Sequence, residues 1–238
     1  MDELSSRFLT AFNVIEDWLQ HTLDAPEGQT FASLLSQTEK LNADVRRHSP
    51  ELKRLAKLRN LIAHNHSHTK PLAVPTVMSV ERIEAIGKQF LSPPMLFTLA
   101  AKPVELCQPS DPLGCCVRKM HDGVFSQLPI YDGKKCCGLL TAETIARWLA
   151  TFFVGDGKGI VDEQSVAEVM QHQEDTVNYT FMPRTATVVE ALAMFDRFLH
   201  RGKRLEAILI SQNGHQTESP LGIVTVYDIP KLNNAING

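Results

Sequence analysis

The spacing of apolar residues divides the chain into a helical part and a mixed part. In the first 97 residues the apolar positions recur three or four residues apart, which is the pattern of an amphipathic helix. The clearest series is Phe8, Phe12, Ile15 and Leu19. Further helices are predicted over 30–41 and 79–91, and Ser49 with Pro50 predicts another helix start, the serine as N-cap and the proline in the first turn. Four helices with short connections predict an all-α bundle.

Beyond residue 101, short β-type runs alternate with helical ones in two rounds. The first round comprises 104–106, 113–120, 127–131, 136–140 and 142–153, and the second comprises 177–181, 188–199, 207–211, 221–226 and 227–232. Each round has a hairpin signal, Asp132 with Gly133 in the first and Asn213 with Gly214 in the second. The fold class is therefore α+β, a helical bundle followed by two β-α-β-β-α units.

The two rounds align as an internal repeat with a constant offset of 84 residues. The first repeat reads Gly-Leu-Leu-Thr-Ala-Glu-Thr over 138–144, and the second reads Gly-Ile-Val-Thr-Val-Tyr-Asp over 222–228. Duplicated units that end in Gly-apolar-apolar-Thr-x-x-Asp resemble a tandem pair of CBS domains. We accordingly expect a helical domain at 1–97, a first CBS repeat at 98–160 and a second at 161–238.

The resemblance to CBS pairs implies an adenosine ligand in a cleft between the repeats. In that family the threonine and the aspartate hold the ribose hydroxyls, which assigns ligand binding to Thr225 and Asp228, with Val177 and Ala207 as further candidate contacts. A carboxylate can accept two hydrogen bonds from a diol. AMP, ADP or ATP is the expected regulatory ligand. The first repeat has Thr144 in place of the acid, so one occupied site is expected. The alternative is that Asp228 only caps the last helix.

Composition agrees with a globular protein and argues against a membrane protein. Apolar residues make up 43% of the chain and charged residues 21%, and no apolar run approaches the ~20 residues of a membrane helix. Five cysteines without an export signal predict a cytoplasmic location with free thiols. We interpret the cysteines as small buried side chains, because neighbours such as Cys136 and Cys137 on a strand point to opposite faces and cannot easily share a metal.

Positive charge is concentrated in one stretch of the helical part. The net charge of the chain is −3, yet residues 40–70 contain eight lysines and arginines against two acids. Within the helix predicted there, Arg59 falls inside the apolar arc of a helical projection. An arginine on a buried face is costly unless it is paired or lines a site. One explanation is an ion pair with Glu16 or Asp17 of the first helix.

The other explanation is a catalytic motif. Residues 59–64 read Arg-Asn-Leu-Ile-Ala-His, and this R-N-x-x-x-H string resembles the signature of HEPN domains, which are small helical domains that include metal-independent ribonucleases. The resemblance assigns catalysis to Arg59, Asn60 and His64. Histidine can remove the 2′-hydroxyl proton near neutral pH, and arginine can stabilise the phosphorane.

The same resemblance implies further partners. HEPN ribonucleases generally build a composite site across a homodimer, so a homodimer is expected, and Lys53 and Lys57 are candidate contacts to single-stranded RNA or tRNA. His64, His66 and His68 could alternatively hold a metal, but no carboxylate or cysteine lies nearby in sequence. We therefore expect no metal site and no required cofactor.

Taken together, the sequence predicts a sensor of adenine nucleotides that regulates an RNA-binding domain or a metal-independent endoribonuclease. Two alternatives remain open. One is a non-catalytic nucleotide sensor, and the other is a dimerisation module that recruits a partner protein.

Overall fold

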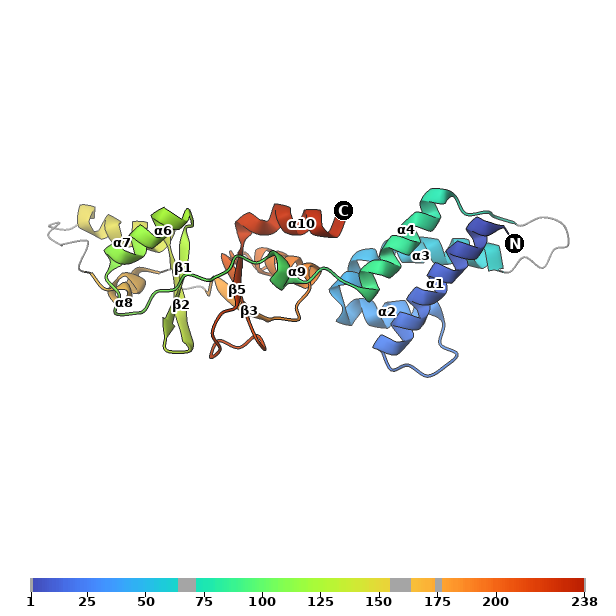
Figure 1. Ribbon diagram of the computed structural model, residues 1–238, viewed down its shortest axis with the longest axis horizontal. Coiled ribbons are helices and arrows are strands. Elements are labelled where there is room, and N and C mark those ends of the chain that lie inside the picture. Colours follow the sequence, from blue (N-terminus) through green and yellow to red (C-terminus); the bar gives the residue numbers. More distant parts are fainter. Residues whose placement is uncertain (1, 64–71, 155–163, 174–176, 238) are drawn as a thin grey trace. The chain divides into compact units, whose positions relative to one another are not determined.

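The computed structural model describes residues 2–63, 72–154, 164–173 and 177–237. The chain divides into two compact units, Met1–Pro94 and Met95–Gly238 (Figure 1). The regular elements described in the first unit are all helices, and the second unit combines helices with two small sheets. The predicted α+β class, with a helical bundle followed by a repeated β-α unit, is confirmed.

The N-terminal unit contains four helices that pack around one apolar core. They are α1 (Glu3–Thr22), α2 (Phe31–Leu41), α3 (Ala43–Ala63) and α4 (Val77–Leu91). The side chains of Asp2, Thr30 and Thr76 cap α1, α2 and α4 by accepting a hydrogen bond from the backbone N–H three residues later. The predicted stripe of α1 is fully buried and packs on α2, α3 and α4, so burial of that stripe organises the bundle.

The prediction that a helix begins at Ser49 is wrong. Helix α3 begins at Ala43 and continues through Pro50. The N-terminal cap comes instead from Asn42, whose Oδ1 accepts a hydrogen bond from the Val45 N–H at 3.1 Å. The hydroxyl of Ser49 donates to the carboxylate of Glu39. The buried face of α3 continues on both sides of Pro50, and its packing offsets the missing N–H of the proline.

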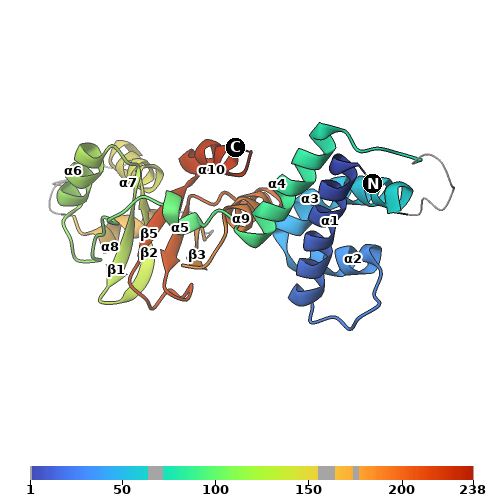
Figure 2. The ribbon, with the colours of Figure 1, turned by 45° about the vertical axis from the view of Figure 1, so that its right-hand side comes forward.

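The C-terminal unit contains the two predicted repeats (Figure 2). The elements that precede and form the first are α5 (Leu96–Leu99), α6 (Leu113–Gly123), β1 (Gln127–Asp132), β2 (Lys135–Thr141) and α7 (Ala142–Val154), followed by the short helices α8 (Val166–Val169) and η1 (Met170–His172). The second comprises β3 (Tyr179–Pro183), α9 (Val188–His200), β4 (Ala207–Ser211), β5 (Gly222–Thr225), η2 (Val226–Asp228) and α10 (Ile229–Asn237). The predicted boundary at residue 160 lies outside the described residues.

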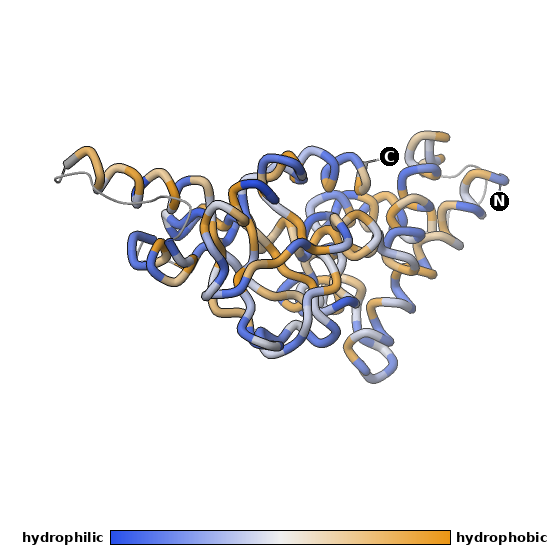
Figure 3. Tube along the Cα trace, turned by 60° about the vertical axis from the view of Figure 1, so that its left-hand side comes forward, coloured by the Kyte–Doolittle hydropathy of each residue, from blue (hydrophilic) through white to orange (hydrophobic). Residues whose placement is uncertain are grey.

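The strands of the two repeats pair in equivalent ways. Strands β1 and β2 form an antiparallel hairpin, and β4 and β5 are likewise antiparallel, with β3 parallel to β4 at the other edge. The run at 104–106 does not form a strand, and a single parallel bridge between Cys107 and Ile130 stands at that edge. Hydrophobic and hydrophilic stretches alternate along the chain (Figure 3), and every residue of β4 is buried.

The segments that lead into each repeat cross over to the other one. Ala101 exchanges two backbone hydrogen bonds with Ile223 of β5, at 2.9 and 3.1 Å. In the opposite direction, Val166 and Val169 of α8 lie in the core of the first repeat. This exchange brings the residues that follow α5 beside the end of β5, where the repeated Gly-x-x-Thr motif lies.

Candidate ligand site at the end of the second repeat

Thr225 and Asp228 are held together at the turn between β5 and α10. Asp228 Oδ2 accepts two hydrogen bonds from Thr225, one from the backbone N–H at 2.8 Å and one from the hydroxyl at 3.0 Å. This arrangement is part of a capping box at the start of η2. Asp228 is therefore the third residue of a capping box at η2, whereas the alternative interpretation of the sequence expected it to cap the last helix. Only one of its carboxylate oxygens is used in these hydrogen bonds.

The first repeat contains the same arrangement without the carboxylate. The Thr144 N–H donates to Thr141 Oγ1 at 3.1 Å, and the two hydroxyl oxygens lie 3.0 Å apart. Both threonines are buried. The 84-residue offset thus relates two structurally equivalent turns, and the acid is present in only one of them.

A cavity of about 630 Å³ lies against the Thr225–Asp228 turn. Residues of both repeats line it, from 101–105, 120–129 and 223–228. Its volume falls in the range of small-molecule sites, roughly 300–1,000 Å³. Because the chain crosses over at Ala101, the cavity has walls from segments that are more than 100 residues apart in sequence.

Several lining residues are absent from the sequence-based prediction. Phe125 and Tyr227 offer aromatic rings, and Gln127 and Glu105 offer polar groups. Tyr227 is 71% exposed although it is large and partly apolar, and its position beside Asp228 in the repeated motif was a usable signal. The others were not predictable, because only the fold brings α6 and β1 to β5.

The two further predicted contacts do not line this cavity. Ala207 is fully buried in β4, where it pairs with Tyr179 on one side and Thr225 on the other. Val177 precedes β3 and is 63% exposed. Of the four predicted ligand contacts, the structure brings Thr225 and Asp228 to one cavity and leaves Val177 and Ala207 outside its lining.

The cysteines only partly follow the prediction of small buried side chains. Cys107, Cys116 and Cys136 are buried, whereas Cys115 and Cys137 are exposed. A hydrogen bond with Cys116, together with burial, raises the pKa of the Cys107 thiol. Among the described residues, no group of three or more His, Cys, Asp or Glu side chains could hold a metal ion.

Arg59 lies on α3 against the first helix. Its Nη2 is 3.4 Å from Glu16 Oε2, and its guanidinium carbon lies 5.5 Å from the centre of the Phe12 ring. The ion pair with Glu16 was one of the two explanations that the sequence offered. The side chain remains 30% exposed, so these contacts leave part of the guanidinium accessible.

The other predicted residues of the helical unit lie on or after α3. Asn60 is exposed and accepts a hydrogen bond from Arg59 at 3.5 Å. His64 lies outside the described residues, as do His66 and His68. Lys53 forms an ion pair with Glu39 at 3.1 Å, and Lys57 is exposed. Arg59 and Asn60 are thus together, and their geometry with His64 is not part of the described structure.

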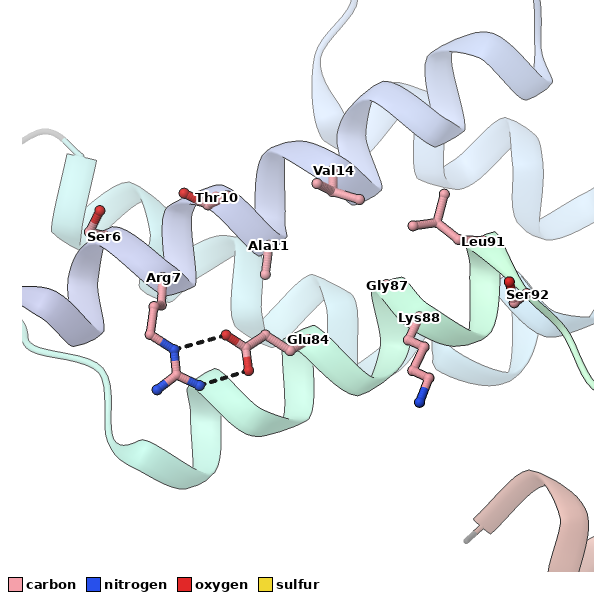
Figure 4. Close-up of a pocket in the computed structure, with 10 residues that line it drawn as sticks. All are labelled: Ser6, Arg7, Thr10, Ala11, Val14, Glu84, Gly87, Lys88, Leu91 and Ser92. Carbon is pink, nitrogen blue, oxygen red and sulfur yellow. Dashed lines mark hydrogen bonds and ion pairs between the residues drawn. The ribbon is translucent and has the colours of Figure 1, made fainter.

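A separate groove of about 500 Å³ runs between α1 and α4 (Figure 4). Arg7 and Glu84 form a two-pronged ion pair across it, with N–O distances of 3.0 and 2.8 Å. Ala11 and Gly87 contribute its small central residues. None of the predicted catalytic or RNA-binding residues in the described part of the chain lines this groove.

No helix among the described residues is both long enough and apolar enough to cross a membrane.

Comparison with known proteins bears on the C-terminal unit. Residues 98–151 match the CBS domain family. Similar solved structures include the CBS domain pair of protein MJ0100 in complex with 5′-methylthioadenosine and S-adenosyl-L-methionine, with 17% identity over 59% of this chain and 95% of that chain and a TM-score of 0.44. A second is the CBS-domain containing protein ATU1752 from Agrobacterium tumefaciens, with 16% identity over 58% of this chain and 92% of that chain and a TM-score of 0.43. A third is an uncharacterized conserved protein from Pyrococcus horikoshii, with 19% identity over 59% of this chain and 92% of that chain and a TM-score of 0.43.

A search of curated proteins finds no match. The family match covers the first repeat. The second repeat has the equivalent antiparallel strand pair, final helix and Gly-x-x-Thr turn. The C-terminal unit therefore contains a match to the CBS domain family over residues 98–151, followed by a second repeat with an equivalent strand pair and turn.

Proposed function

We propose that the CBS pair binds an adenosine derivative in the cavity at the end of β5, with the ribose at Thr225 and Asp228. The observation that carries this proposal is the state of the Asp228 carboxylate. Its Oδ2 accepts both hydrogen bonds from Thr225, and no hydrogen bond from any described residue reaches Oδ1. The capping box fixes the carboxylate at the cavity edge and leaves one oxygen to accept a hydrogen bond from a ribose hydroxyl.

The rest of the lining suits a purine base. Val104, Pro129 and Ile223 give apolar walls, and Phe125 and Tyr227 give aromatic rings. A flat heteroaromatic base stacks favourably on such rings, a contact worth about 1–3 kcal/mol per base in nucleic-acid complexes. Adenosine derivatives with and without phosphate, AMP, ADP and ATP among them, share the ribose and base that this site would recognise.

Calorimetric titration of the full chain with adenosine tests the proposal. We expect one adenosine per chain, and we expect Asp228→Asn to weaken binding by roughly tenfold or more, because a hydrogen bond to a charged group is worth about 1.5–3 kcal/mol. The matched control is Thr144→Val, which changes the equivalent position of the first repeat and should leave the affinity unchanged. Equal affinity of Asp228→Asn and the unaltered chain would reduce Asp228 to a cap.

For the helical unit we propose an effector role in the cytoplasm, as a homodimer that binds or cleaves RNA under control of the CBS ligand. The supporting observation is that the partly exposed Arg59 and the exposed Asn60 are hydrogen-bonded to each other near the end of α3. This places a partly exposed arginine and an exposed amide side by side, five and four residues before His64 in the sequence.

The test is cleavage of single-stranded RNA or tRNA by the full chain in the presence of EDTA. We expect products with 2′,3′-cyclic phosphate ends, no cleavage of DNA, and loss of cleavage in His64→Ala, with light scattering reporting a dimer. Lys57→Ala should weaken RNA binding and reduce its salt dependence by about one unit of slope. Binding without cleavage would leave an RNA-binding sensor. Neither binding nor cleavage would favour the non-catalytic sensor or dimerisation module.

A further inference from the structure

The charges around the cavity at the Thr225–Asp228 turn indicate which kind of adenosine derivative binds there, and this inference depends on the adenosine site proposed above. Glu105 and Asp228 contribute carboxylates to the lining, and His121 contributes an imidazole. No lysine or arginine lines the cavity in the part of the chain that the structure describes. Even with His121 protonated, the lining carries net negative charge.

The lysines that are nearest in sequence to the lining segments are held at backbone oxygens. Lys102, Lys119 and Lys231 donate from Nζ to the carbonyl oxygens of Phe97, Leu106 and Leu99, at 3.2, 2.9 and 2.7 Å respectively. The ammonium of Lys102 also lies 4.1 Å from the centre of the Phe97 ring. These contacts direct the three ammonium groups to backbone carbonyls of residues outside the lining.

Two other sources of positive potential are also offset. The N-terminal end of a helix attracts phosphate, and α10 begins at Ile229 next to the cavity. Asp228 immediately precedes it, and a carboxylate at that position opposes the positive end of the helix dipole. The imidazole of His121 is highly exposed, and its Nδ1 lies 3.1 Å from the carboxylate of Asp122.

We infer that the cavity selects adenosyl compounds that carry no phosphate, either neutral ones such as adenosine or cationic ones such as an adenosyl sulfonium, over AMP, ADP and ATP. A phosphate group carries about −1.5 to −2 charges at pH 7. Bringing it to a lining with two carboxylates and no engaged cation adds repulsion to the cost of desolvation. A sulfonium cation in the same position is attracted by both carboxylates.

Titration of the full chain with four probes tests the inference: adenosine, S-adenosylmethionine, AMP and ATP. We expect AMP and ATP to bind at least about tenfold more weakly than adenosine, a difference of about 1.4 kcal/mol. Raising the ionic strength should weaken the binding of S-adenosylmethionine and strengthen the binding of AMP, because salt screens attraction and repulsion alike. Both salt effects would be reversed in a site that is built for phosphate.

The Glu105→Gln variant removes one of the two lining carboxylates and should improve AMP binding about threefold relative to adenosine. Asp196→Asn is the matched control, because it removes one negative charge from an exposed position on α9 and should leave the ratio unchanged. AMP or ATP binding as tightly as adenosine would overturn the inference and leave the adenosine site intact. Absence of binding by all four probes would overturn the proposed function itself.

Discussion

Replacing Arg59 with alanine separates a structural from a functional role for this residue. The change removes an ion pair of 3.4 Å whose two side chains are 30% and 24% exposed, and it removes the contact with the Phe12 ring at 5.5 Å. Exposed and partly exposed ion pairs contribute about 0.2–1 kcal/mol, and a cation–π contact at such a site contributes about 0.5–1 kcal/mol. We therefore expect Arg59→Ala to lower the free energy of unfolding of the helical unit by roughly 1–2 kcal/mol.

Urea denaturation followed by tryptophan fluorescence measures this loss. The chain has two tryptophans, Trp18 in the helical unit and Trp148 in the C-terminal unit, so a Trp148→Phe background leaves Trp18 as the reporter of the helical unit. A double-mutant cycle with Glu16→Gln should give a coupling free energy of about 0.2–1 kcal/mol. The Arg7–Glu84 pair, with 44% and 39% exposed side chains, is the matched control on the same unit.

The size of the loss decides between the roles. A loss of about 3–5 kcal/mol would be typical of a broken buried ion pair and would refute the argument that the guanidinium is accessible for chemistry. A coupling energy of zero would refute the ion pair itself. A stable Arg59→Ala chain that no longer binds or cleaves RNA, while Arg7→Ala retains the activity, would support the effector role.

Three further predictions concern stability. Asp228→Ala should lower the free energy of unfolding of the ligand-free C-terminal unit by about 1 kcal/mol through loss of the capping box, as measured by thermal denaturation. Asp228→Asn should lower it less, because the amide oxygen can still accept a hydrogen bond from the Thr225 N–H, and equal losses would contradict the capping role. Gly214→Ala should be more destabilising than Gly133→Ala in the same assay. Both glycines have a positive φ, but only at Gly214 would an added Cβ lie 3.0 Å from Pro183 N. The reverse order of stability would contradict this close approach. Burial lowers the pKa of His48, and a hydrogen bond to Gln89 opposes this shift. The unfolded state therefore binds more protons, and the stability of the helical unit should fall as pH drops below about 6.5. Urea midpoints at pH 7.5 and 5.5 should differ less in a His48→Gln chain, and an equal difference would contradict the assignment.

The elements were predictable where a local pattern determines them. The apolar stripe of α1 and the hairpin at Asp132 and Gly133 depend on residues that are close in sequence, and the structure has both. The start of α3 was not predictable from Ser49 and Pro50, because the local start signal competes with burial along the whole of α3. A packed helix face can outweigh the hydrogen bond that an internal proline removes.

The ligand site was predictable on one side only. Thr225 and Asp228 follow from the internal repeat, since a duplicated motif marks equivalent turns. The opposite wall, which includes Phe125 and Glu105, depends on the crossing of the chain at Ala101. The burial of the cysteines was likewise predictable only in part. The strand pattern places Cys136 and Cys137 on opposite faces, but only the packing of β2 shows that Cys136 is buried and Cys137 exposed.

The duplication supplies an internal comparison between holding the fold and binding a ligand. In both repeats the threonine that ends the last strand bonds to the residue three positions later, and both turns are formed. In the first repeat the hydroxyl of Thr144 is sufficient for this purpose, so formation of the turn does not require a carboxylate. The acid at position 228 supplies what a hydroxyl cannot, a negative charge and a second oxygen at the cavity edge. Since the fold explains only one of those two oxygens, the other is the feature of Asp228 that binding of a ribose would use.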